Sequence, residues 1–236
     1  MKIIFKLLSS VLSLLLIATL AAGSFFAIKG HRMYTDAIAS CPPETIIEKI
    51  RNQENFIPYE SLPALYVDAV VAVEDKRFWE HHGIDCLATA RALWNDLRAR
   101  AFIQGGSTIT QQLAKNLYFT QEKKLERKVA ELFVALRIED HYTKEEIFEL
   151  YANTIYFGSG YYGIYDAAMG YYGKPPSELS DAQVIMLVGL PNAPSAYSLD
   201  QNPQLAKQRM KQVLDRMVSC SILSQEEADL LFEKNE

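Results

Sequence analysis

The sequence predicts a mainly α protein, in which one helical domain follows a single N-terminal hydrophobic helix. An uncharged run extends from Leu7 to Ile28. Beyond it, apolar residues recur at helical spacing, and Ser, Thr or Asn precedes most of these segments, where it would cap a helix. Alternating patterns typical of strands are few. With 236 residues and 49% hydrophobic content, the chain is long enough to bury one core.

The first expected element is a membrane-spanning helix over 7–28. As a helix this run would be about 33 Å long, enough to cross a hydrocarbon layer of about 30 Å. We expect a retained anchor; the alternative is a cleaved signal peptide, because small residues such as Ala21 and Gly23 offer cleavage sites. Basic residues stand on both sides of the run, so charge alone does not orient it. Residues 29–58 are expected to form a polar connector, broken at "CPPE".

The next expected helix covers 59–73 and ends in two carboxylates. Glu74 and Asp75 then lie at its C-terminal end. The helix macrodipole makes that end negative, so acidic residues there cost stability. Either the run "EDKRFWEHHG" is an ordinary solvated turn, or these acids have a catalytic role.

Helical patterns continue through the rest of the chain. Helices are expected at 85–102, 105–119, 122–142, 143–153, 180–190, 202–217 and 224–234. Capping boxes open three of them, with Thr143, Ser180 and Ser224 as caps. Asn202 caps another, with Pro203 at its first position. The segment "VIMLVGL" is apolar on nearly every side and predicts a central buried helix.

Two of these helices carry apolar stripes. In the helix over 122–142 the stripe consists of Val129, Leu132, Phe133 and Leu136. In the helix over 202–217 one face consists of Ala206, Met210, Val213, Leu214 and Met217. Together with the other elements, they predict a domain extending to about residue 233.

Composition excludes several functions. A net charge of −5 disfavours a broad nucleic-acid surface. The three cysteines are scattered and form no CxxC pair, which indicates neither a disulfide framework nor a cysteine metal site. No HExxH, GxSxG, P-loop, SxxK or KTG pattern occurs, so zinc-hydrolase, serine-hydrolase, nucleotide and penicillin-type transpeptidase chemistry are not indicated.

The stretch "QGGSTITQQLAKN" at 104–116 combines a glycine pair with a helix start. Glycines allow close backbone approach, and the free N–H groups of the following turn suit an anion. The alternative is an ordinary capped helix with a polar face, which accounts for the same residues.

The stretch "KKLERKVAE" at 123–131 places Lys124, Arg127, Lys128 and Glu131 on one helical stripe. The row could neutralise a phosphate, or it could be a solvated face with an Arg127–Glu131 pair. The Tyr- and Gly-rich stretch at 156–174 suits sugar rings and chain packing equally.

In this order, the stretches resemble the motifs of the peptidoglycan glycosyltransferases, family 51 of the glycosyltransferases. "EDKRFWEHHG" is similar to the motif ED-x-x-F-x-x-H-x-G, and "GGSTITQQLAKN" to the second motif of the family. "RKVAELFVALRIEDHYTKEEIFELYAN", "IYFGSGYYGIYDAAMGYYGK" and "LSDAQVIMLVGLPNAPSAYSL" resemble the third, fourth and fifth. The likeness covers about residues 60–220.

The resemblance implies a lysozyme-like helical fold on one anchor and a monofunctional enzyme that polymerises lipid II. Lipid II is a disaccharide-pentapeptide on undecaprenyl pyrophosphate, so the reaction is an inverting hexosyl transfer. Implied partners are lipid II, the growing glycan, membrane lipid and other cell-wall synthesis proteins, with no nucleic acid. The implied segments are a short cytoplasmic N-terminus (1–6), the anchor (7–28), the connector (29–58) and an extracytoplasmic glycosyltransferase domain (59–233).

The resemblance also assigns site residues. Glu74 matches the glutamate that removes the proton of the attacking hydroxyl, and Glu131 matches a second catalytic glutamate that would lie near the leaving group or a divalent ion, Mg or Mn. The expected substrate-binding residues are Asp75, Phe78, His82, Gly83, Ser107, Thr108, Gln111, Gln112, Lys115, Asn116, Lys123, Arg127 and Lys128.

Two positions depart from the family pattern: Gln183 stands where glutamate is usual, and Ala152 where leucine is frequent. Gln183 puts rate or metal use in doubt more than the class of reaction. Two other functions stay open from the sequence. One is a lysozyme-like glycan hydrolase, which also uses two carboxylates; the other is a tethered binder whose site has decayed.

Overall fold

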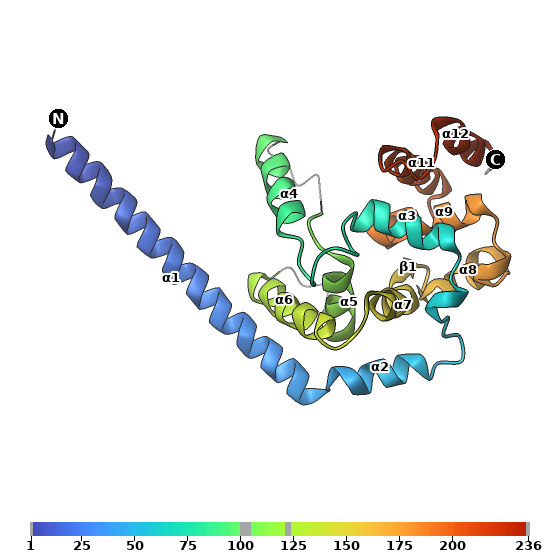
Figure 1. Ribbon diagram of the computed structural model, residues 1–236, viewed down its shortest axis with the longest axis horizontal. Helices are drawn as coiled ribbons and strands as arrows, with labels where there is room; N and C mark the ends of the chain where they lie inside the picture. The colour runs from blue at the N-terminus through green and yellow to red at the C-terminus, as the bar shows by residue number, and fades with distance from the viewer. Residues whose placement is uncertain (1, 100–104, 121–123, 235–236) are drawn as a thin grey trace.

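The computed structural model is mainly α and describes residues 2–99, 105–120 and 124–234. Figure 1 shows α1 reaching out from a compact group of helices. The helices are α1 (Lys2–Ser40), α2 (Pro43–Arg51), α3 (Ala64–Glu74), α4 (Cys86–Ala99), α5 (Ile109–Tyr118), α6 (Leu125–Glu139), α7 (Lys144–Thr154), α8 (Ile164–Tyr172), α9 (Asp181–Gly189), α10 (Pro194–Tyr197), α11 (Pro203–Ser219) and α12 (Gln225–Glu233). Short 3-10 turns are η1 (Tyr59–Ser61), η2 (Pro176–Glu178) and η3 (Leu190–Asn192), and the strands are β1 (Tyr156–Gly158) and β2 (Tyr161–Tyr162). The predicted fold class is therefore confirmed.

Helix α1 is longer than the expected anchor. Among the described residues, one helix is long and apolar enough to cross a membrane, and it continues to Ser40. Its last part lies along α6 (Figure 1), where an added Cβ on Gly30 would come within 2.5 Å of Val129. The Phe133 ring lies 5.1 Å from that of His31. The apolar stripe predicted on α6 thus contacts α1. A different set of α6 residues is buried in the domain: Ala130, Glu131, Val134, Ala135 and Ile138.

The segment expected as a polar connector is mostly helical. The break predicted at "CPPE" is present between α1 and α2, but α2 is an amphipathic helix. Ile47 and Ile50 of α2 belong to the main core. The mainly polar composition of residues 29–58 hid this contribution, because a short amphipathic helix needs only a few apolar residues on one face.

The core is centred on α9, as its composition predicts. Nearly all of α9 is buried, and it packs against α3 and α11. Helix α11 uses the predicted face, since Ala206, Met210, Val213, Leu214 and Met217 are all buried. The capping boxes at Thr143, Ser180 and Ser224 are present, with the expected side-chain to backbone hydrogen bonds.

The Tyr- and Gly-rich stretch contains a β-hairpin that the sequence pattern did not predict. The turn uses left-handed backbone at Gly158 (φ 93°), Ser159 (φ 51°) and Gly160 (φ 88°). A Cβ on Gly158 would lie 2.7 Å from the Pro194 carbonyl oxygen, so this position requires glycine for space as well as for its backbone angle. The strands are too short for an alternating pattern to be recognised.

Candidate active site

Glu74 ends α3, as predicted, and its carboxylate turns toward α5. Gln112 Nε2 donates a hydrogen bond of 2.8 Å to Glu74 Oε2. The side chain is half-buried and lines a cavity of about 470 Å³. Glu74 is therefore held by a neutral donor and remains accessible from the cavity.

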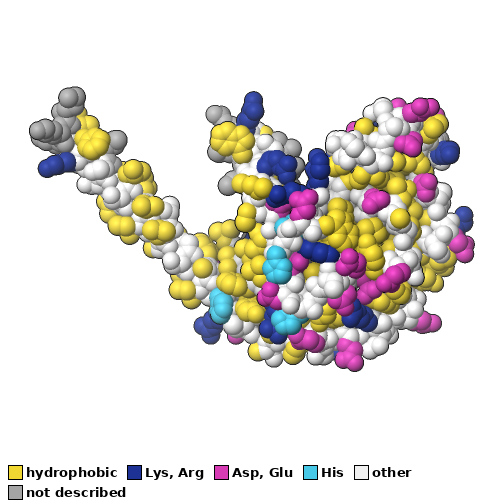
Figure 2. Space-filling view, in the orientation of Figure 1, with side chains coloured by type: hydrophobic (Ala, Val, Ile, Leu, Met, Phe, Trp, Pro, Cys, Tyr) yellow, Lys and Arg dark blue, Asp and Glu magenta, His cyan; other side chains and the backbone are white. Residues whose placement is uncertain are grey.

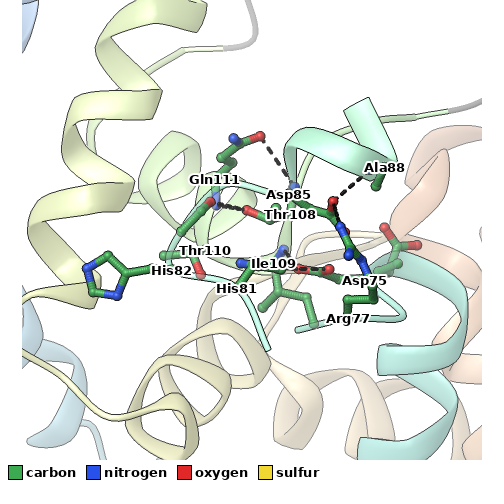
Figure 3. Close-up of polar contacts among 12 residues, drawn as sticks. Asp75, Arg77, His81, His82, Asp85, Ala88, Thr108, Ile109, Thr110 and Gln111 are labelled. Atoms are coloured by element: carbon green, nitrogen blue, oxygen red, sulfur yellow. Dashed lines mark hydrogen bonds and ion pairs between the residues drawn. The ribbon is translucent and has the colours of Figure 1, made fainter. Parts of the chain in front are cut away.

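Asp75, the next residue, is buried and serves a different purpose. Its two oxygens lie 3.0 and 2.9 Å from His81 Nε2, and Oδ2 accepts the Ile109 N–H at 3.0 Å. Figure 3 shows these groups meeting between α3 and α5. Ile109 is the first residue of α5, so this carboxylate lies at the positive end of a helix dipole. The charge that is unfavourable at the end of α3 is thus favourable at the start of α5.

The start of α5 is fixed by a capping box. Thr108 is the cap, and its hydroxyl accepts from Gln111 N–H and donates to the Gly83 carbonyl oxygen at 2.7 Å. Gly83 has a positive φ of 74°, which its lack of a side chain permits. The box ties the segment after α3 to α5 and fixes where Gln112 and Lys115 lie on that helix.

The cations form a group behind the cavity. Lys128 Nζ donates to Ser107 Oγ at 2.7 Å and lies 3.0 Å from Glu131 Oε2, while Arg127 pairs with the other oxygen of Glu131. Lys115 lines the cavity itself. Burial lowers the pKa of Lys115; the charges of Arg127 and Lys128 act in the same direction, and those of Glu131 and Glu74 oppose them. Lys115 thus interacts electrostatically both with Glu74 and with the Arg127–Lys128–Glu131 group.

The cavity brings together segments that are far apart in the sequence. The lining comes from the end of α3, the first part of α4, the residues around 105–108, α5, η3 and α11. Figure 2 shows Lys and Arg side chains gathered around the hollow between α4 and the rest of the domain. The basic residues in the lining are Lys76, Arg91, Lys115, Arg209 and Arg216.

Two further acids border the cavity, but both are engaged. Asp75 is bound to His81 and Ile109 as described. Arg77 Nε donates to Asp85 Oδ2 at 2.9 Å, and Asp85 Oδ1 accepts the Ala88 N–H at 2.6 Å (Figure 3). The Arg77 hydrogen bond lowers the pKa of Asp85. Among the described residues of the lining, Glu74 is thus the carboxylate left open to the cavity.

Several residues expected to bind substrate lie elsewhere. Phe78 has no exposed surface and packs in the core against Phe148. Gln111 is buried in the capping box, and Asp75 is 6% exposed. Phe78 and Gln111 support the site from within, whereas Asp75 borders the cavity with little exposed surface.

The expected residue His82 also lies outside the cavity lining. Its side chain is 60% exposed and its Nε2 is 2.9 Å from Asp140. The histidine that contacts Asp75 is His81. Counting ED-x-x-F-x-x-H-x-G from Glu74 also leads to His81, so the motif spacing itself contained the signal that was missed.

The other expected binding residues divide between the lining and the layer behind it. Ser107, Thr108, Gln112 and Lys115 line the cavity, whereas Gly83, Asn116, Arg127 and Lys128 do not. Lys123 lies outside the described residues. Further lining residues from η3 and α11 were not expected: Pro191, Asn192, Arg209, Gln212 and Arg216. The three from α11 carry no sequence signal beyond the apolar face of that helix.

The residues present do not fit a metal ion held by Glu131. This side chain is 1% exposed, and its two oxygens already meet Arg127 and Lys128. Within the described ranges, no group of three or more His, Cys, Asp or Glu could hold a metal. Glu131 thus fixes two cations instead of offering a free ligand.

The departures from the family pattern have structural explanations. Gln183 is the third residue of α9 and completes its capping box, where its Oε1 accepts the Ser180 N–H at 3.0 Å. Glutamine and glutamate fill this position equally well, and Gln183 does not line the cavity. Ala152 is fully buried in α7. Gln183 thus caps a helix and Ala152 packs in the interior, and neither residue lines the cavity.

Comparison with known proteins agrees with the geometry. A family model described as Transglycosylase matches residues 43–218. A Cupriavidus necator protein that is provisionally named a transglycosylase is 38% identical over 224 residues, which cover 95% of each chain. Penicillin-binding protein 2D of Bacillus subtilis is 43% identical over 76% of this chain and 26% of its own, and penicillin-binding protein 1A of Aquifex aeolicus is 45% identical over 73% and 24%.

The chain therefore spans about a quarter of the length of these two penicillin-binding relatives. Among solved structures, penicillin-binding protein 1A of Haemophilus influenzae aligns over 75% of this chain and 17% of its own, with 22% identity and a TM-score of 0.45.

Proposed function

The chain belongs to the transglycosylase family, and from this premise we propose that it polymerises lipid II into peptidoglycan glycan strands. The observation that carries the proposal is that Glu74 and Lys115 line the same cavity, with the Arg127–Lys128–Glu131 group directly behind it. A base and a cationic patch in one cavity are what glycosyl transfer from a diphosphate requires.

The proposed step transfers the donor sugar to an acceptor hydroxyl. Glu74 takes the proton of this hydroxyl as its oxygen bonds to the anomeric carbon of the donor. The bond from that carbon to the diphosphate oxygen breaks with inversion, and the diphosphate departs with the bonding electrons. Lys115 meets the developing negative charge, while Lys128 and Arg127 add positive potential behind it. The hydrogen bond from Gln112 keeps the Glu74 carboxylate in place.

This geometry disfavours the hydrolase alternative. Glycoside hydrolysis commonly uses two available carboxylates across the scissile bond. Here Asp75 and Asp85, which also border the cavity, are bound to His81 and Arg77. A cationic group is also of little use for an alcohol leaving group.

The expected Mg or Mn enters the proposal only as a companion of the diphosphate substrate. Since Glu131 is already occupied by two cations, Glu131→Gln should lower activity equally at every concentration of Mg²⁺. A variant that regains activity at high Mg²⁺ would contradict this and make Glu131 a ligand.

The proposed location follows from the substrate. With α1 as a single-pass anchor in the cytoplasmic membrane, the cavity would lie on the extracytoplasmic face, where membrane lipid, the growing glycan and other cell-wall synthesis proteins meet it. A cysteine-accessibility experiment on intact cells, with one cysteine introduced at an exposed α12 position, tests the orientation.

The decisive experiment incubates the purified full chain with lipid II and separates the products on a gel. We expect a ladder of lengthening glycan from the wild type. Glu74→Gln should lower the rate by about 10²- to 10⁴-fold while keeping its melting temperature. Shortening of preformed glycan would support the hydrolase, and lipid II binding without turnover by the wild type would support a binding protein.

A further inference from the structure

The end of α3 leaves backbone carbonyl groups without helical partners. The last four C=O groups of any helix lack an intrahelical donor. At the end of α3, the Val71 carbonyl accepts from Asp75 N–H. The Ala72 carbonyl instead accepts from the side chain of Arg216, whose Nε lies 3.0 Å away.

This contact joins two helices that are remote in the sequence. Arg216 lies near the end of α11, beside the fully buried Met217. Because α11 packs in the core against α3 and α9, the Arg216 backbone is fixed. Its guanidinium therefore ties the last turn of α3, only two residues before Glu74, to a rigid part of the molecule.

The position of Arg216 is also favourable in charge. The C-terminal end of a helix carries a partial negative charge, and a cation there is stabilising. At the end of α3 this effect offsets part of the cost of the Glu74 and Asp75 carboxylates. Arg216 also lines the same cavity as Glu74.

Glu74 is then held from two directions. Gln112 of α5 holds its carboxylate, and Arg216 of α11 holds the backbone that carries it. A helix end without such a contact frays, and a displacement of about 1 Å at a reacting group can cost about 10²-fold in rate. We propose that Arg216 is a positioning residue for Glu74, acting through the Ala72 carbonyl. This inference rests on the proposed function.

The test compares steady-state polymerisation by Arg216→Met and Arg216→Lys. Methionine keeps the apolar stem but has no donor, so we expect kcat to fall about 10- to 100-fold with KM changed less than about twofold. Lysine can still donate to a carbonyl, although without the guanidinium geometry, and should recover most of the loss. The matched control is Lys211→Met, which removes an exposed cation from the same helix and should leave kcat unchanged.

Binding separates positioning from substrate contact. In the Glu74→Gln background, where turnover is suppressed, adding Arg216→Met should leave the Kd for lipid II within about twofold. If Arg216→Met raises KM or this Kd with kcat intact, Arg216 binds substrate and the proposal is wrong. If kcat is unchanged, or if lysine fails to rescue a folded methionine variant, the proposal is also wrong.

Folding is checked by the melting temperature of each variant. Should Arg216→Met melt well below the wild type, Arg216→Gln, which retains an amide donor, carries the comparison with the lysine variant. Failure of the wild type to polymerise lipid II would overturn the proposed function instead, and that outcome is visible before any variant is compared.

Discussion

At the junction of α3 and α5, the Asp75 carboxylate and the Thr108 hydroxyl touch the edge of the cavity but are almost fully buried, and both meet hydrogen-bond partners. On the same two helices, Glu74 and Lys115 border the cavity and face open space. The two regions differ in burial and in satisfaction of polar groups, although their residues are neighbours in the sequence. A substitution at the buried junction should therefore lower stability, whereas one at the cavity border should lower the rate.

Lys115→Met should give the largest contrast. Removing the cation that we propose stabilises the leaving group should lower kcat/KM by about 10²- to 10³-fold. Because burial disfavours the charged ammonium, the melting temperature should stay equal to or rise above that of the wild type. Glycan synthesis and thermal unfolding measured on the same preparation check both halves. A variant that melts lower while losing activity would place Lys115 among the structural residues.

The pH dependence of Lys115 sharpens the same contrast. Since burial lowers its pKa from the ordinary 10.5, activity should fall on the alkaline side below the usual range of a lysine. The folded protein binds the Lys115 proton less tightly than the unfolded chain does. The charged lysine therefore lowers the stability at neutral pH, and this cost disappears as the pH rises from the lowered to the ordinary pKa. Lys115→Arg keeps its charge and should shift the alkaline fall of the rate to higher pH; an unmoved profile would contradict this origin.

Asp75→Asn should show the opposite pattern. It leaves His81 and the Ile109 N–H without their carboxylate in a buried place, so the free energy of unfolding should drop by about 3 kcal/mol. Denaturant unfolding in detergent measures this. Intact stability with lost turnover would mean that Asp75 takes part in the reaction itself.

Gln112 is intermediate in burial between the two regions, and Gln112→Leu tests its contact with Glu74. It removes the hydrogen bond to Glu74 while keeping similar volume, so kcat should fall about tenfold, in line with the value of one hydrogen bond to a charged group. Stability should change little, because Gln112 is only half-buried. Gln112→Glu, which places a second carboxylate beside Glu74, should be the more harmful variant, and equal rates for the two would argue against the contact.

The smallest effect is expected from Gln183→Glu, which restores the residue usual in the family. Both side chains complete the Ser180 capping box, so stability should change by less than about 0.5 kcal/mol and the rate should stay the same. A marked increase in rate would mean that position 183 acts on the cavity from a distance.

Elements governed by local rules could be predicted from the sequence. The buried face of α11 and the capping boxes depend on spacings of three or four residues, which are legible in the chain. The position of Glu74 at the end of α3 followed in the same way.

Features that depend on distant contacts could not be predicted. The Arg216 contact with Ala72 joins residues 144 apart, and no local pattern indicates it. The burial of Phe78 and Glu131 also depends on which elements pack over them. The difference between His82 and His81 is of another kind, since the motif spacing alone indicates His81.

The unbroken course of α1 has a mechanical consequence. One continuous rod leaves the apolar run and lies along α6, the helix that bears the Arg127 and Lys128 cations. In the membrane-anchored arrangement that we propose, a domain mounted on such a continuous helix would not rotate freely relative to the bilayer. A change in the tilt of α1 would then turn α6 with it, and the Arg127 and Lys128 side chains would change their height above the bilayer.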